Sequence, residues 1–146
     1  YNGEMFGSGG NDMVSFNNGV LYLHEANPVY NNFYDRQYSS YVTVVGNSEL
    51  KNKIYKSLRT KSTTAWAAPQ ITNDRGQFSL LMEDNFSERE GIFYAEFKRD
   101  MNTPNVVYPI INGVVLRDFA IQIKLENYNL QKEILTYVEI NQIDSK

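Results

Sequence analysis

Alternation of apolar and polar residues between Glu90 and Leu125 is the sequence feature that most constrains this fold. The apolar positions are Phe93, Ala95 and Phe97, followed by Phe119, Ile121, Ile123 and Leu125. Side chains repeat every two residues along a strand, so this pattern predicts strands with one buried face. An antiparallel sheet that is packed on one side and wet on the other meets that requirement.

A hairpin is predicted near the start of the chain. Met13–Phe16 and Val20–Glu25 flank Asn17-Asn18-Gly19, and Asn-Gly supplies the two positive φ angles of a type I′ turn. The alternation of the second strand predicts Leu21 and Leu23 facing inward, with Tyr22 and His24 facing outward.

Other segments are less regular. Residues 50–58 fit one face of a short helix or a strand, and the β-rich context favours a strand. Pro69 lacks a backbone donor, which predicts that Thr63–Thr72 contains an edge strand. Residues 106–111 read as an extended apolar segment, and a change of phase predicts a bulge near Arg117–Asp118.

The composition supports the same fold class. Aromatic residues make up 14% of the chain, and Asn is frequent, which favours strands joined by tight turns. The strand spacing predicts an antiparallel β-sandwich or barrel-like domain of about seven to nine strands, with at most one short helix.

The predicted domain organisation is an arm followed by one domain. Residues 1–12 hold four glycines among polar side chains, which predicts a flexible arm or linker. Residues 13–146 are predicted to form a single β domain, long enough to bury roughly 70% of its unfolded surface. The start at Tyr1 suggests a processed product or a piece of a longer chain.

Charge and residue types exclude several classes of function. A net charge of −3 and a pI near 5.2 provide no basic field for nucleic acid or anionic lipid. The sequence holds no cysteine and one histidine, so thiolate and multi-histidine metal sites are excluded. It contains no nucleotide-binding glycine motif and no apolar run of membrane-spanning length. We therefore predict no cofactor, no metal site and no membrane segment.

Two groups of residues are candidates for catalysis. A Ser-His-Asp triad would have to use His24, which we expect to be an exposed or rim histidine. Glycoside hydrolysis needs only two carboxylates at a set separation, and one acidic cluster offers candidates. This cluster comprises Glu83, Asp84, Glu88 and Glu90. Arg89 and Arg99 are near enough in sequence to neutralise it, so no catalytic residue is predicted.

Aromatic residues outside clear strand alternation form the candidate binding surface. These residues are Tyr30, Phe33, Tyr34, Tyr38 and Trp66. Aromatic rings bury much area with little loss of entropy and are enriched at interfaces. Three roles are open for them: plugging the end of the sandwich, forming a subunit interface, or providing a platform on which sugars stack.

Four segments carry a resemblance to a known family. They are FYDRQYSSYVTVVGNSELKNKIYKSL, EDNFSEREGIFYAEFKRD, INGVVLRDFAIQIKL and LTYVEI. Their order and spacing resemble a module near the C-terminal end of the tail-tube, nozzle or muzzle proteins of short-tailed, crAss-like phages of gut bacteria. The resemblance covers Tyr30 to Ile143 and departs from the family at Asp118, where a glycine is more natural.

This resemblance implies a non-enzymatic structural β domain of a phage tail, located in the virion. The implied partners are further copies of the chain, arranged in a ring, or neighbouring tail proteins. The family carries no active-site residues to transfer. The alternative function is a β module that binds carbohydrate or a host surface through surface glycans. A carboxylate-pair glycoside hydrolase is the third.

Overall fold

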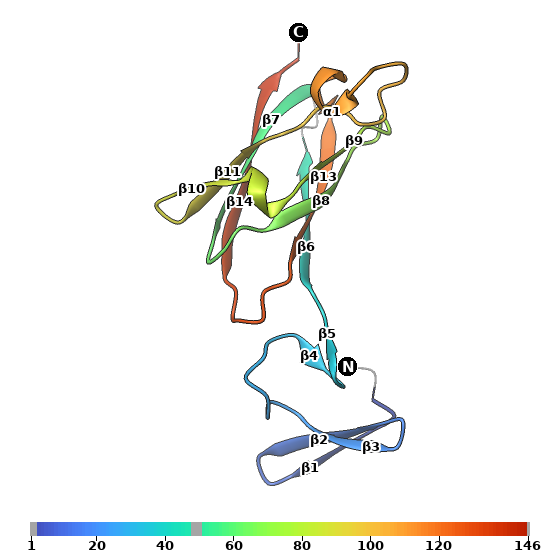
Figure 1. Ribbon diagram of the computed structural model, residues 1–146, viewed down its shortest axis with the longest axis vertical. Helices are drawn as coiled ribbons and strands as arrows, with labels where there is room; N and C mark the ends of the chain where they lie inside the picture. The colour runs from blue at the N-terminus through green and yellow to red at the C-terminus, as the bar shows by residue number, and fades with distance from the viewer. Residues whose placement is uncertain (1–2, 48–50, 146) are drawn as a thin grey trace. The chain divides into compact units, whose positions relative to one another are not determined.

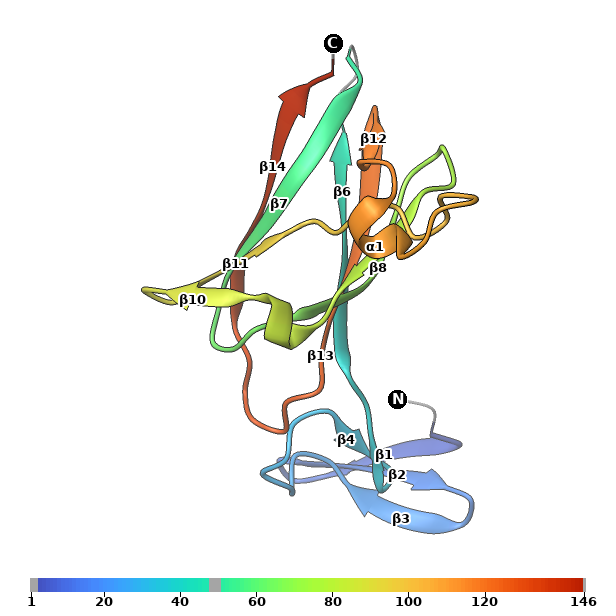
Figure 2. The same ribbon diagram turned by 45° about the horizontal axis from the view of Figure 1, so that its top comes forward.

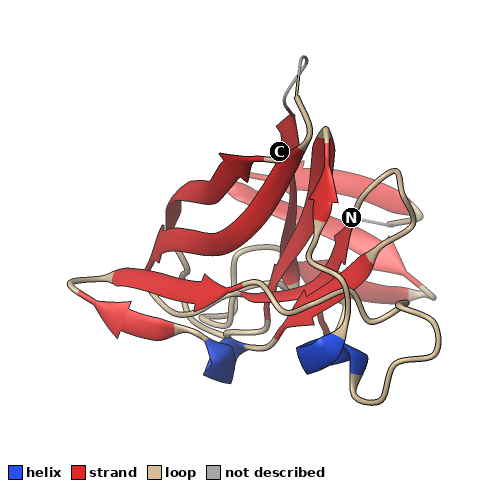
Figure 3. Ribbon diagram, turned by 90° about the horizontal axis from the view of Figure 1, so that it is seen from above, coloured by secondary structure: helices blue, strands red, loops and turns tan. Residues whose placement is uncertain are grey.

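The computed structural model describes residues 3–47 and 51–145, and the chain divides into two compact units. Unit 1 comprises Tyr1–Ser40 and Tyr128–Lys132, and unit 2 comprises Tyr41–Asn127 and Glu133–Lys146. Strands dominate the structure (Figure 3), and two short helical turns interrupt them within the described residues. The predicted all-β class is confirmed. The single domain predicted from residue 13 onward differs from this division, because strand alternation does not show which sheets share a core.

Unit 1 contains two small antiparallel sheets. The first has three strands in the order β1 (Met5–Gly9), β2 (Asp12–Asn17) and β3 (Val20–Leu23), which lie side by side in Figure 2. The second pairs β4 (Asn32–Phe33) with β5 (Arg36–Gln37). Because β1 forms a full ladder with β2, the prediction of an irregular arm is wrong for Met5–Gly9. Pairing with a neighbouring strand offsets the backbone entropy that its glycines lose.

The predicted hairpin is confirmed at Asn18-Gly19. Strands β2 and β3 pair with Asn17 opposite Val20, and the two central residues have φ angles of 52° and 75°. Two positive φ angles at these positions are what a type I′ turn requires.

Unit 2 contains a five-stranded antiparallel sheet built around β7. Its members are β10 (Ser87–Arg89), β11 (Ile92–Glu96), β7 (Lys53–Ser62), β12 (Arg117–Asp118) and β14 (Leu135–Asp144). Strand β7 pairs with β11 and β12 along its length and with β14, and β7 and β14 run side by side in Figure 1. The strand prediction for residues 50–58 is confirmed from Lys53 onward, and Leu50 lies outside the described residues.

The second sheet of unit 2 has four strands. Their order is β6 (Ser40–Asn47), β13 (Ala120–Asn127), β8 (Ala67–Thr72) and β9 (Phe78–Leu81). Strand β8, which contains Pro69, lies between β13 and β9, so the prediction of an edge strand is wrong. The register of β8 with β9 shifts between Ala68 and Ile71, and such an irregularity accommodates a residue that cannot donate to a ladder.

The change of phase near Asp118 arises from a change of sheet. Strand β12 pairs with β7 in the first sheet, whereas β13, which starts at Ala120, belongs to the second. The predicted bulge near Arg117–Asp118 is therefore wrong. The buried Asp118 carboxylate accepts hydrogen bonds from the backbone N–H groups of Arg75 (3.0 Å) and Phe119 (2.8 Å). These bonds hold the backbone where the chain passes from the first sheet to the second. A glycine at this position would leave both donors without that acceptor.

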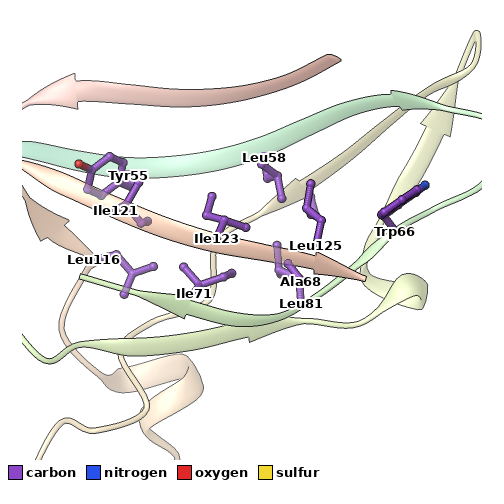
Figure 4. Packing of buried hydrophobic residues seen from close by; sticks show 11 residues of the cluster. Tyr55, Leu58, Trp66, Ala68, Ile71, Leu81, Leu116, Ile121, Ile123 and Leu125 are labelled. Carbon is purple, nitrogen blue, oxygen red and sulfur yellow. The ribbon is translucent and has the colours of Figure 1, made fainter. Parts of the chain in front are cut away.

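The core of unit 2 lies between its two sheets, as in a β-sandwich. Leu58 of β7, Ile71 of β8 and Ile123 of β13 are fully buried, and Figure 4 shows their side chains in the space between the strands. Complete burial of each such side chain contributes roughly 1.5–3 kcal/mol. The predicted inward face of β11 is confirmed, because Phe93 and Ala95 are buried.

The described residues contain fourteen strands, more than the seven to nine predicted. Four of the additional strands are pieces of two or three residues, too short to show a period in the sequence: β4, β5, β10 and β12. A fifth, β1, lies in the segment predicted as an arm. The helical turns are η1 (Glu83–Asn85) and α1 (Pro109–Asn112). The extended segment predicted over 106–111 is wrong at α1, because proline has a φ angle suited to the first turn of a helix.

Candidate functional site

A cluster of polar and aromatic side chains from the inner face of the three-stranded sheet of unit 1 forms the candidate site. The Ser15 hydroxyl on β2 is hydrogen-bonded to Nε2 of His24 at 2.7 Å and to the Tyr34 hydroxyl at 2.9 Å. Ser15 is fully buried, while the His24 and Tyr34 side chains are half-buried. The three groups join the sheet to the loop that follows β3.

Edge-to-face contacts extend this cluster. The ring centroid of Tyr34 lies 5.0 Å from that of Tyr22 and 6.1 Å from that of His24, with interplanar angles of 88° and 87°. The Tyr22 hydroxyl donates a hydrogen bond of 3.1 Å to Oδ2 of Asp35. That bond to a carboxylate stabilises the protonated phenol and raises the pKa of Tyr22 above its ordinary value.

The orientation of β3 is opposite to the one that the sequence predicts. Leu21 and Leu23 are 57% and 51% exposed, whereas Tyr22 and His24 are half-buried. The polar aromatic side chains face the loop because Ser15, directly opposite Tyr22 in the ladder, and the loop itself supply their partners. The alternation of apolar residues in β3 does not predict that Tyr22 and His24 face inward, because their hydrogen-bonding partners lie outside the strand.

The loop after β3 is held in a defined conformation. Four of its non-glycine residues, Glu25, Asn31, Tyr34 and Asp35, have φ angles between 52° and 61°. Left-handed backbone is uncommon for residues other than glycine and persists where surrounding contacts determine it.

Amide side chains provide many of those contacts. Asn27 accepts a hydrogen bond from the backbone N–H of Val29 at 2.6 Å and donates to Oδ1 of Asn32 at 3.1 Å. Gln37 donates to the backbone carbonyl of Tyr30 at 2.8 Å. The loop is therefore organised by its own polar groups.

This loop surrounds an open pocket of about 770 Å³. The pocket is lined by residues 22–35 alone, all of which belong to unit 1. Its volume falls in the range of small-molecule sites, roughly 300–1,000 Å³.

The structure brings four of the five predicted site residues together. Tyr30, Phe33, Tyr34 and Tyr38 belong to unit 1, and the first three line the pocket. The Phe33 and Tyr38 ring centroids lie 6.1 Å apart, so these two rings pack against each other. Tyr30 is 50% exposed.

Trp66, the fifth predicted residue, lies elsewhere. It belongs to the hydrophobic core cluster of unit 2, whose side chains are drawn in Figure 4. Its side chain is only 6% exposed. A buried indole presents no free face for stacking. Trp66 therefore does not form part of an exposed aromatic platform.

The four carboxylates considered for hydrolysis are exposed around η1 and β10. Among residues 3–47 and 51–145, no group of three or more His, Cys, Asp and Glu side chains is placed to hold a metal ion. Within the same residues, no helix is long and apolar enough to cross a membrane.

Comparison with known protein families identifies the chain. The sequence model of the Crassvirus muzzle protein C-terminal domain matches residues 28–100, which is half of the chain. The chain belongs to this family. Its membership confirms the resemblance found in the sequence and makes it a phage structural protein of the tail type. No curated protein matches the chain.

The match to the muzzle family runs from the pocket loop to Asp100, beyond the end of β11. It begins at residue 28, inside the loop that lines the pocket, and it spans β4 to β11. Strands β1 to β3 precede the matched residues.

Several residues of the candidate site were not singled out from the sequence. Ser15 and Asp35 carried no signal, because neither belongs to a motif. Tyr22 and His24 share one face of β3, and a repeat of polar aromatic residues is a cue for a face that needs hydrogen-bonding partners.

Proposed function

We propose that this chain is a non-enzymatic structural domain of a phage tail and that it contacts further copies of itself in a ring. Its family supplies the tail-type structural role. The observation that carries the proposed contact is an exposed apolar face on the β1–β2–β3 sheet of unit 1.

The ladder register defines this face. In one row Met5 lies opposite Phe16, which lies opposite Leu21. In the next row Val14 lies opposite Leu23. Residues directly opposite one another share a face of the sheet, so these five side chains form one apolar face.

The apolar face is open to solvent. Leu21 and Leu23 are more than half exposed, and Met5 is 65% exposed. Contiguous exposed apolar patches on soluble proteins mark interaction sites, because leaving them in water is unfavourable. None of the five side chains is charged, so the partner surface is expected to be apolar as well, as it is when copies of one chain meet.

Two observations support the absence of catalysis. The Ser15 hydroxyl next to His24 is fully buried, which keeps it from a substrate. A glycosidase pair acts on a substrate held in a cleft, and Glu83 and Glu88 are exposed and lie outside the lining of the pocket. We therefore do not propose hydrolysis of glycosides.

Light scattering of purified chain tests this proposal. A double variant, Leu21→Lys with Leu23→Lys, places charges on the apolar face and should shift the protein from oligomer to monomer. Val107→Lys is the matched control, because Val107 is exposed but belongs to unit 2. An oligomer distribution that is the same in the wild type and the double variant would contradict the proposed contact.

A further inference from the structure

We propose that the open pocket lined by residues 22–35 binds a neutral saccharide. This inference goes beyond the proposed structural role. Saccharide binding and the subunit contact are tested by different experiments, so either can be wrong without the other. Strand β3 contributes Tyr22, Leu23 and the adjoining His24 to the pocket lining, and the loop that follows contributes the rest.

The charge of the lining excludes anionic ligands. The lining residues are all described in the structure, and they include no Lys or Arg. Two of them, Glu25 and Asp35, carry carboxylates. A phosphate or an acidic sugar would meet these two like charges, and the one imidazole of the lining, His24, is hydrogen-bonded to Ser15.

Aromatic rings give the pocket apolar walls. Tyr22, Tyr30, Phe33 and Tyr34 all belong to the lining. The C–H faces of a pyranose ring are apolar, so they pack against aromatic rings and leave the hydroxyl groups at the rim. Tyr30 is half exposed, and its ring can therefore be covered by a ligand.

Polar groups in the lining match sugar hydroxyls. Asn27, Asn31 and Asn32 line the pocket, and each donates one side-chain N–H within unit 1, to Asn32, Ser40 and Gln37 respectively. A side-chain amide has two N–H donors, so the second donor of each can meet a sugar hydroxyl. A carboxylate accepts about four hydrogen bonds, and Tyr22 supplies one of those made to Asp35. A sugar hydroxyl both donates and accepts hydrogen bonds, so it can accept from an Asn amide N–H and donate to the Asp35 carboxylate.

The same amides favour a saccharide over an organic cation. A quaternary ammonium ion would be attracted by the rings and by Asp35, but it has no acceptor for an Asn N–H. The lining contains three Asn residues against two carboxylates.

The loop is pre-organised for binding. Its left-handed residues Asn31, Tyr34 and Asp35 and its internal amide hydrogen bonds fix the walls before a ligand arrives. A wall that is already ordered loses less conformational entropy on binding, which raises the affinity available from few contacts.

Nuclear magnetic resonance titration of the full chain tests the inference. The probes are glucose, galactose, mannose, N-acetylglucosamine, maltose, cellobiose and lactose, each added to tens of millimolar. Choline and N-acetylneuraminic acid are the comparison ligands, one cationic and one anionic. We expect at least one neutral sugar to shift the amide resonances of residues 22–35.

Two variants locate the site. Tyr30→Ala removes one wall, and Asp35→Asn removes the charge but keeps a residue that tolerates left-handed backbone. Each should lower the sugar affinity about tenfold, the change expected from losing one good contact. Tyr41→Ala, an exposed tyrosine outside the lining, should leave the affinity unchanged.

Three results would overturn the inference. They are binding of choline or N-acetylneuraminic acid without any neutral sugar, no binding of any probe, and sugar binding that both Tyr30→Ala and Asp35→Asn leave intact. None of these results bears on the oligomeric state, so the proposed subunit contact is tested separately.

Discussion

The hydroxyl of Tyr22 donates a hydrogen bond of 3.1 Å to Oδ2 of Asp35, which joins β3 to the end of the pocket loop. Asp35 lies at a φ angle of 61°, so the bond is made by a residue in left-handed backbone. This hydrogen bond holds two walls of the pocket together. It also shifts the pKa of the Tyr22 phenol, which can be measured.

Asp35→Asn should lower the pKa of Tyr22 toward its ordinary value. The folded protein holds the Tyr22 proton more tightly than the unfolded chain, because the phenol donates to a carboxylate. The stabilisation is complete below the ordinary pKa of about 10 and is lost as pH rises through the higher pKa of the folded state. Alkaline unfolding of the variant should therefore depend less on pH.

Carbon-13 resonances of the tyrosine rings measure this pKa, and Tyr22→Phe assigns the signal. Asp84→Asn is the control, because Asp84 is an exposed acid on η1. If Tyr22 titrates at the same pH in the Asp35→Asn protein, the hydrogen bond does not raise its pKa in solution.

Asp100→Ala should destabilise unit 2 by about 3 kcal/mol. The buried Asp100 carboxylate accepts hydrogen bonds from the backbone N–H groups of Phe78 (2.9 Å) and Asn102 (3.0 Å), and alanine would leave both unsatisfied. Asp100→Asn retains one acceptor oxygen, so its effect should be smaller, roughly 1 kcal/mol. Urea unfolding followed by circular dichroism measures both. Equal stability of the two variants would contradict this account.

Gly113→Ala should lower the free energy of unfolding by about 2 kcal/mol. A Cβ atom at this position would overlap the backbone carbonyl oxygens of Pro109 and Asp100, which belong to the backbone and cannot rotate away. The φ angle of Gly113 is −67°, so lack of space, not backbone strain, requires glycine. Gly9→Ala is the control, because an added Cβ there meets nothing within 4 Å. Thermal unfolding that shifts equally in both variants would disprove the overlap.

Local patterns in the sequence predicted the parts of the fold that depend on neighbouring residues. Asn18-Gly19 forms the predicted turn, because two positive φ angles are a local requirement. The alternation at Phe93 and Ala95 follows burial, because β11 has one packed face and one wet face.

Features set by distant partners could not be predicted in the same way. The face of β3 that turns inward is chosen by Ser15 and Tyr34, which pair with His24 and Tyr22 from outside the strand. The change of sheet after Asp118 looked like a bulge, because either event reverses the apolar phase. The pocket needs the left-handed residues of the loop, which no periodic pattern reports.

Asp144→Asn should reduce the sensitivity of unit 2 to acid. Asp144 forms ion pairs with Lys53 and, at 3.0 Å, with Lys51, and hydrogen bonds from the two lysines lower the pKa of Asp144. Stabilisation from a lowered carboxyl pKa is present above the ordinary value and is lost as pH falls through the folded value. The unfolding midpoint should therefore fall less steeply below about pH 4 in the variant. Asp74→Asn, a change at an exposed acid, is the control. The same acid dependence in the wild type and Asp144→Asn would argue against the ion pairs.

Trp66→Ala should destabilise the protein by roughly 3–5 kcal/mol, because it opens a cavity in the core of unit 2. Trp66→Phe keeps much of the ring and removes an indole N–H that has no hydrogen-bond partner among the described residues, so its cost should be about 1 kcal/mol. Urea unfolding followed by circular dichroism gives both values, and Tyr30→Ala is the matched control from the pocket. If Trp66→Ala unfolds at the same urea concentration as the wild type, Trp66 is not a core residue. Trp66 would then be a candidate for the exposed aromatic surface predicted from the sequence.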